Sequence, residues 1–190
     1  MFALGSLALS TLLAAACAIL AENPVPAEPK TADTAFAVIY APGVTAITYD
    51  ITTVPPAGRV QLSISSPGEP LKVTLAVTGL APDRVFGAHL HTKSCAPTGA
   101  GAGPHYQHRP DPAANTEHPS VDPAYTNAEN EVWLDFRTDD SGRAGAASAH
   151  EWSYDAGRAP LSLIIHAEAT KTGPGQAGQA GARLACVNLP

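Results

Sequence analysis

The sequence predicts an all-β fold, an antiparallel sandwich or barrel of about eight strands with long loops between some of them. Short segments with alternating apolar residues recur along the chain, and no amphipathic pattern of helical period extends beyond two turns. Gly (16) and Pro (18) are plentiful among the 190 residues, and charged residues make up 15%. This composition is typical of a chain with many turns. The length suits one domain with tails.

The alternation is clearest in 59–65, where Val60, Leu62 and Ile64 would share one face of a strand. Pro and Gly mark turns between segments, and residues 139–142 predict a hairpin turn. A short apolar run at 37–40 is either a first strand or part of a tether. The eight expected strands are 45–52, 59–65, 71–78, 86–91, 132–137, 144–149, 161–167 and 183–189.

The first part of the chain differs in character from the rest. Residues 1–21 carry no charge and are dominated by Leu and Ala, which favours a signal segment for export to the cell envelope or beyond. Cys17 ends an Ala-Ala-Ala-Cys run that resembles a lipoprotein box, so Cys17 would be lipidated and attach the protein to a membrane. Cleavage near Ala18 or Ala21, which discards Cys17, is the alternative. The Pro-rich residues 22–36 predict a disordered tether, and 37–190 form the expected domain.

Two cysteines remain once Cys17 is set aside. An exported protein can form disulfides, so we expect Cys95 to pair with Cys186. Two unrelated buried thiols are the alternative. The formal net charge of −6 argues against nucleic acid as a partner, and it means that an anionic substrate needs a local positive patch.

Four of the seven histidines are candidate metal ligands. His89 and His91 are one residue apart on an expected strand, so their side chains point the same way. His105 lies in the long irregular connection 97–131, which predicts either a functional or a disordered loop, and His166 lies near the end of an apolar strand. Imidazole suits copper, zinc, iron and nickel alike, so spacing by itself does not name the metal. We interpret His108 and His150 as surface or core residues.

Three motifs resemble those of the copper-zinc superoxide dismutases, in the same order along the chain. Gly87-Ala88-His89-Leu90-His91 is similar to the family's first copper-ligand motif. Gly103-Pro104-His105-Tyr106 is similar to the motif of the bridging histidine, and residues 181–186, which read GARLAC, are similar to the closing signature. The segment Ile164-Ile165-His166 matches the strand of the fourth copper ligand. The resemblance covers roughly residues 45–189.

The resemblance implies a fold, a site and an activity. The fold would be an eight-stranded Greek-key sandwich with a long metal-binding loop and a Gly-rich loop at 173–181. Copper would be bound by His89, His91, His105 and His166, and Cys95 would pair with Cys186. Arg183 would be the active-site arginine that docks superoxide. Independently of the resemblance, the net charge of −6 opposes the approach of an anion, so we expect Lys93, Arg109 or Lys171 near the cleft to help attract it. His105 would leave copper on reduction, take a proton, and return on reoxidation.

These features predict a copper-dependent superoxide dismutase that converts superoxide to oxygen and hydrogen peroxide in the cell envelope. The alternative is a copper-binding or copper-buffering envelope protein with little activity. Arg183 favours the enzyme, because a copper carrier does not need it. A sandwich module that has lost its metal ranks last.

The expected zinc site departs from the family's pattern. The loop after His105 does not have the family's spacing of zinc ligands, and Thr170 stands where an aspartate that links the two metals is expected. His118 with Asp122 is the pair that best fits a zinc remnant, and a solvated loop histidine is the alternative. The sequence therefore predicts a copper-only or zinc-depleted member.

Overall fold

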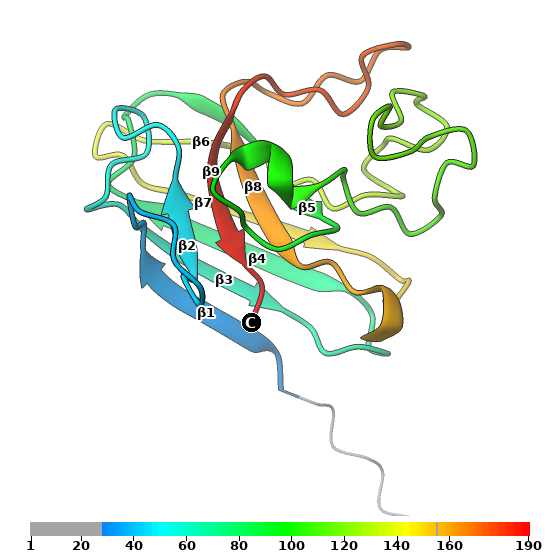
Figure 1. Ribbon diagram of the computed structural model, residues 1–190, viewed down its shortest axis with the longest axis horizontal. Helices are drawn as coiled ribbons and strands as arrows, with labels where there is room; N and C mark the ends of the chain where they lie inside the picture. Colours follow the sequence, from blue (N-terminus) through cyan, green and yellow to red (C-terminus); the bar gives the residue numbers. More distant parts are fainter. Residues whose placement is uncertain (1–27, 155) are drawn as a thin grey trace, which may run out of the picture.

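The computed structural model describes residues 28–154 and 156–190 as two facing antiparallel sheets (Figure 1). One sheet has four strands in the order β1 (Lys30–Ala35), β3 (Arg59–Ile64), β4 (Lys72–Thr78), β7 (Ala144–Ala149). The other has five in the order β2 (Ala46–Thr48), β9 (Arg183–Asn188), β8 (Ser162–His166), β5 (Val85–His91), β6 (Phe136–Arg137). Two short 3-10 turns, η1 (Gly99–Ala102) and η2 (Ala156–Arg158), are the only helical segments among the described residues.

The predicted β-sandwich is confirmed, and the two sheets are not closed into a barrel. Strands β4 and β7 are neighbours in the four-stranded sheet although they are far apart in the sequence. The chain passes from one to the other by a Greek-key crossover through the five-stranded sheet. The alternating side chains of β4 place Val73, Leu75 and Val77 in the core and the residues between them in solvent. In contrast, nearly every residue of β5 and all of β8 are buried, because loops cover the outer face of that sheet.

The prediction that residues 22–36 form a disordered tether is wrong for the second half of this segment. Residues 30–35 form β1, which pairs with β3 from Lys30 opposite Ile64 to Ala35 opposite Arg59. Asp33 accepts hydrogen bonds from Arg59 at 2.7 Å and Gln61 at 2.9 Å. An edge strand exposes polar side chains, so its composition resembles that of a linker. The described domain therefore includes β1 and does not begin at residue 37.

The signal segment, Cys17 and the first part of the tether lie outside the described residues. Among those that are described, no helix has the length and apolar character needed to cross a lipid bilayer.

The expected strand 132–137 is shorter than predicted, since only Phe136 and Arg137 pair in a ladder. The turn at 139–142 does form, with the amide of Asp139 donating to the carbonyl of Arg143 at 2.9 Å. However, it leads from β6 in one sheet to β7 in the other, so the predicted hairpin is absent. Turn chemistry is local and does not determine which sheet the next strand joins.

Two devices hold the loops against the five-stranded sheet. Cys95 and Cys186 form a disulfide, which ties the segment before η1 to β9, as predicted. The buried side chain of Asn130 accepts from the amide of Arg109 and donates to the carbonyls of Arg109 and Tyr125. The long connection is therefore closed by hydrogen bonds at its base.

Candidate metal centre

The four predicted histidines meet at one place on the five-stranded sheet. His89 and His91 lie on β5 and are fully buried, and His105 pairs with His91 in an isolated bridge. His166 ends β8, where it lies opposite Gly87 of β5. Each histidine offers one ligand atom, and these atoms all lie within 4.8 Å of one another. The described residues contain no other cluster of three or more metal-ligating side chains.

Hydrogen bonds occupy one nitrogen of each ring. Nδ1 of His91 lies 2.9 Å from the carbonyl of Gly103, and Nδ1 of His166 lies 3.4 Å from the carbonyl of Gly181. The other nitrogens, His91 Nε2 and His166 Nε2, are buried without a hydrogen-bond partner, as is His89 Nδ1. A buried polar atom without a partner destabilises a fold, and a metal ion bound to these nitrogens removes that cost. The donor set therefore fits a metal ion that accepts imidazole ligands.

The environment keeps these imidazoles neutral. Burial and the charges of neighbouring side chains, His105 first among them, lower the pKa of His89 and His91 well below 6.5. The same two causes lower the pKa of His166 to about 3. Only a neutral imidazole has a lone pair for a metal, so His89, His91 and His166 are in their ligating form at neutral pH.

Glu131 anchors His105 from the far side of the ring. Its side chain is 1% exposed, and its Oε2 accepts from Nδ1 of His105 and from Nε1 of Trp133, both at 2.8 Å. The side-chain amide of Gln107 donates to Oε1 at 2.9 Å. A carboxylate behind a ligating histidine fixes its tautomer, which leaves Nε2 of His105 for the metal.

Sequence reasoning missed Glu131 as a functional residue, along with Asp135, which lies near His89. A signal for them exists, because Glu131, Trp133 and Asp135 alternate with the buried Val132, Leu134 and Phe136. A strand beside the metal site would turn these polar residues toward it. The alternation indicates a shared face, but only the tertiary structure identifies what that face meets.

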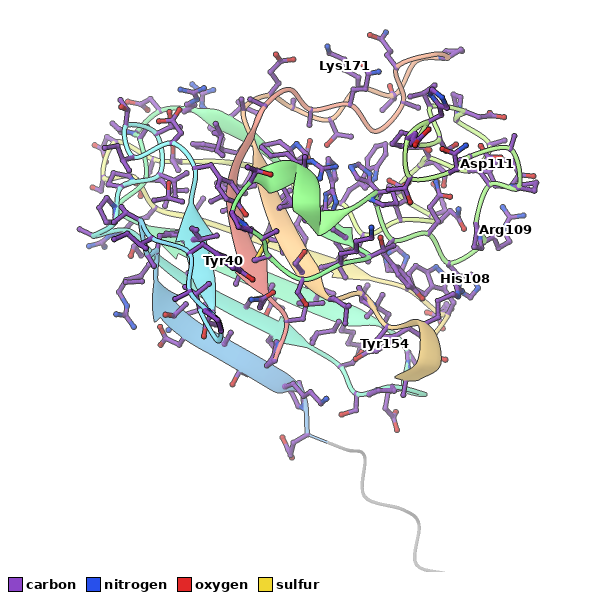
Figure 2. All side chains as sticks on the ribbon, in the orientation of Figure 1. Tyr40, His108, Arg109, Asp111, Tyr154 and Lys171 are labelled. Carbon is purple, nitrogen blue, oxygen red and sulfur yellow. A yellow bond between two sulfur atoms is a disulfide. The ribbon has the colours of Figure 1, made fainter. Side chains whose placement is uncertain are left out.

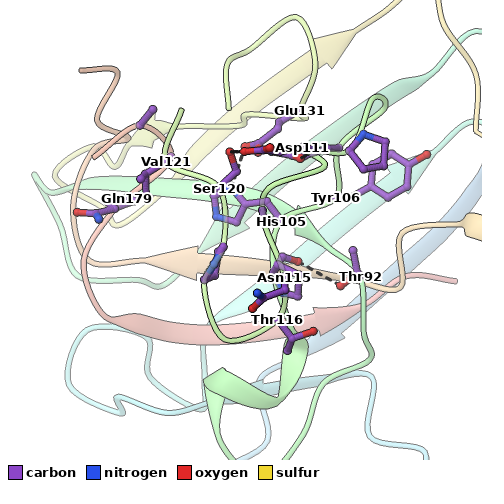
Figure 3. A pocket seen from close by; sticks show the side chains of 18 of the residues that line it. Thr92, His105, Tyr106, Asp111, Asn115, Thr116, Ser120, Val121, Glu131 and Gln179 are labelled. Atoms are coloured by element: carbon purple, nitrogen blue, oxygen red, sulfur yellow. Dashed lines mark hydrogen bonds and ion pairs between the residues drawn. The ribbon is translucent and has the colours of Figure 1, made fainter. Parts of the chain in front are cut away.

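A cavity of about 860 Å³ opens over the histidines, lined by His105, His166, Arg183, Lys171 and Arg158 among others. Figure 3 shows His105 and Glu131 at this cavity, beside Asn115, Thr116 and Ser120 of the long loop. Nη1 of Arg183 donates to the carbonyl of Gly99 at 2.8 Å, and burial lowers the pKa of its guanidinium.

The other residues predicted near the site are distributed differently. Lys171 lines the cavity and lies 3.4 Å from the carboxylate of Glu168, whereas Lys93 and Arg109 are not among the lining residues. Figure 2 shows Lys171 and Arg109 at different edges of the molecule. His118 and Asp122 are both exposed, and neither belongs to the metal-ligating cluster.

The chain is similar to known proteins in sequence and in fold. The sequence model of the copper/zinc superoxide dismutase (SODC) family matches residues 56–189. The Cu/Zn superoxide dismutase from Brucella abortus is similar in structure, with a TM-score of 0.52 and 20% identity, covering 85% of this chain and 100% of that one. A double mutant of a SOD-like protein from Bacillus subtilis has a TM-score of 0.47 and 20% identity, covering 68% of this chain and 87% of that one. A search of curated protein sequences found no match.

Proposed function

Since the chain belongs to the copper/zinc superoxide dismutase family, we propose that it is a copper-dependent enzyme that converts superoxide to dioxygen and hydrogen peroxide. The observation that carries this proposal is the convergence of three buried, unpartnered imidazole nitrogens, from His89, His91 and His166, with His105 beside them. A bound copper ion would supply a centre that both accepts and donates one electron. The chain's own residues hold the geometry and admit the substrate.

Arg183 has the properties needed to dock a small anion. It lines the cavity together with His105 and His166, and its hydrogen bond to the carbonyl of Gly99 fixes the direction of the guanidinium. With a formal net charge of −6, the whole molecule repels superoxide. Local attraction at the cavity therefore depends on Arg183 and Arg158, since Lys171 is close to the opposite charge of Glu168.

The chemistry around His105 favours a copper-only site. The carboxylate of Glu131 accepts the hydrogen of Nδ1, so this nitrogen carries a proton and does not serve as a ligand to a second metal. His118 and Asp122 remain the best pair for a zinc remnant, and both are exposed to solvent. We therefore propose that each chain binds one copper ion and does not require zinc.

Export to the cell envelope is part of the proposal, with Cys17 as a candidate lipid attachment site. The disulfide between Cys95 and Cys186 supports it, because structural disulfides are typical of oxidising compartments. Mass spectrometry of the protein isolated from cell membranes tests whether Cys17 is the first residue of the mature chain and carries a lipid. A soluble mature chain that lacks Cys17 would overturn the lipid anchor and leave the export.

Purification with metal analysis and a dismutation assay tests the main proposal. We expect about one copper per chain and activity that is lost in His166→Ala, while His118→Ala, an exposed histidine, keeps both. Copper near one equivalent without activity would indicate instead a copper-binding or copper-buffering protein with this fold. Failure to retain copper would overturn both functions.

A further inference from the structure

We infer that Thr170 and Asp135 act as a relay that sets the tautomer of His89 and keeps its Nδ1 open to the metal. The two residues are positioning residues, since neither belongs to the metal-ligating cluster. The inference rests on the proposed metal site, and it accounts for the threonine that stands where a linking aspartate is expected.

The relay consists of short contacts. Nε2 of His89 lies 2.6 Å from Oγ1 of Thr170, and the hydroxyl of Thr170 donates to Oδ1 of Asp135 at 2.6 Å. The backbone amide of Thr170 donates to Oδ2 of Asp135 at 2.7 Å. His89 Nε2 and Asp135 Oδ1 are 3.8 Å apart, too far for a direct hydrogen bond.

The direction of the hydrogen bonds follows from the number of protons. A threonine hydroxyl has one hydrogen, and an ionised carboxylate has none to donate. Because the hydroxyl hydrogen is directed to Asp135, Oγ1 presents a lone pair to His89. His89 must therefore carry its proton on Nε2, which leaves the lone pair on Nδ1, the nitrogen that is buried without a partner.

Close packing holds Thr170 at this position. A Cβ added to Gly87 would lie 2.7 Å from the carbonyl oxygen of Glu168 and 3.2 Å from Oγ1 of Thr170, so the loop after β8 approaches β5 where there is no side chain. The amide of Glu168 donates to the carbonyl of Ala180, and that of Lys171 to the carbonyl of Gln179. The loop is thus fixed on both sides of Thr170.

The decisive variant is Asp135→Asn. Two backbone amides donate to Asp135, that of Thr170 to Oδ2 at 2.7 Å and that of Ala88 to Oδ1 at 3.3 Å, and the single oxygen of an asparagine can face only one of them. We expect the oxygen to face the amide of Thr170, because this contact is the shorter, which turns the NH₂ group toward Oγ1. The hydroxyl then has to donate to Nε2 of His89, which moves the imidazole proton to Nδ1, where it blocks the metal. Nitrogen NMR of the metal-free full chain reads the tautomer directly. We expect His89 to be protonated at Nε2 in the wild type and at Nδ1 in Asp135→Asn.

A double-mutant cycle distinguishes the relay from a direct effect of Asp135. Thr170→Val removes the hydroxyl. Thr170→Ser keeps it, so this variant should show the wild-type NMR signal, with His89 protonated at Nε2. If the relay acts in series, Asp135→Asn has little further effect in the Thr170→Val background. Asp33→Asn, which alters an exposed carboxylate on the other sheet, serves as the control.

Copper affinity gives a second readout. We expect Asp135→Asn and Thr170→Val each to weaken copper binding about 10- to 100-fold, and Thr170→Ser to bind like the wild type. A wild-type chain that binds no copper would overturn the proposed function and leave the NMR test of the relay intact. An unchanged Nε2 tautomer in Asp135→Asn would overturn the relay even if copper binds.

Discussion

Nδ1 of His105 lies 2.8 Å from the carboxylate of Glu131, a side chain that is 1% exposed and is held by Trp133 and Gln107 as well. A buried carboxylate that accepts hydrogen bonds from three donors has partners for both of its oxygens, which offsets the cost of burying it. His105 is thereby held in one orientation, with one nitrogen left to face the other histidines.

Replacing Glu131 should expose the importance of this pairing. In Glu131→Gln the oxygen can still accept from His105 and Trp133, but the new NH₂ group faces the amide donor of Gln107. We expect a loss of about 1 to 3 kcal/mol in the free energy of unfolding, measured in urea, together with reduced dismutation. Glu129→Gln, at an exposed neighbouring position, should change neither quantity. Equal stability of the two variants would contradict the prediction.

Arg183 should affect substrate capture and leave the metal in place. In Arg183→Ile we expect the rate constant for superoxide to fall about tenfold or more, with copper content unchanged, because the cation beside the histidines is lost. In the wild type the rate should also fall as salt is added, since screening weakens attraction. Stopped-flow assays across ionic strength check both. A wild-type rate that does not depend on salt would refute electrostatic attraction.

The disulfide should contribute strongly to stability, because Cys95 and Cys186 are 91 residues apart. Cross-linking distant residues reduces the entropy of the unfolded chain, and removing the link costs about 2 to 5 kcal/mol. Thermal unfolding of Cys95→Ser with Cys186→Ser, compared with the wild type, measures the loss. A shift in Tm of less than a degree would count against this account.

Acid should destabilise the metal-free protein over a defined range. The folded-state pKa of His166 is lowered to about 3 from a usual value of 6.5, so the unfolded chain binds this proton first as pH falls. The contribution of His166 to the free energy of unfolding is therefore fully present above pH 6.5 and is lost as the pH falls from 6.5 to 3. Urea unfolding of the metal-free wild type and of His166→Gln should give a shallower pH dependence for the variant. Parallel curves would show that His166 does not contribute.

Gly87 should not tolerate a side chain. An added Cβ would lie 2.7 Å from both the carbonyl oxygen of Glu168 and the Cβ of Ala180, so Gly87→Ala must displace the loop that carries Thr170. We expect a lower Tm and weaker copper binding. Gly145→Ala, on β7, is the matched control, because its Cβ meets only the carbonyl of Leu75 at 3.5 Å. Similar effects of the two substitutions would disprove the packing argument.

The sequence predicts the candidate metal ligands and the arginine beside them. His89 and His91 share a face because strand side chains alternate, and the motifs around His105, His166 and Arg183 predict their roles by resemblance. The described structure brings the four histidines together and forms the predicted disulfide. The alternating apolar segments likewise predict most of the strands and the sandwich.

The residues that form hydrogen bonds to the histidines are determined by tertiary contacts. Thr170 and Asp135 are 35 residues apart, and His89 and Thr170 are 81 apart, so no local period relates them. The polar composition of β1 resembles a tether until β3 pairs with it, and the turn at 139–142 does not determine which sheet the following strand joins. Residue type and local alternation are enough to identify the side chains that can bind a metal. The hydrogen bonds that orient these side chains could not be predicted, because they form between distant segments that meet only when the two sheets and their loops pack.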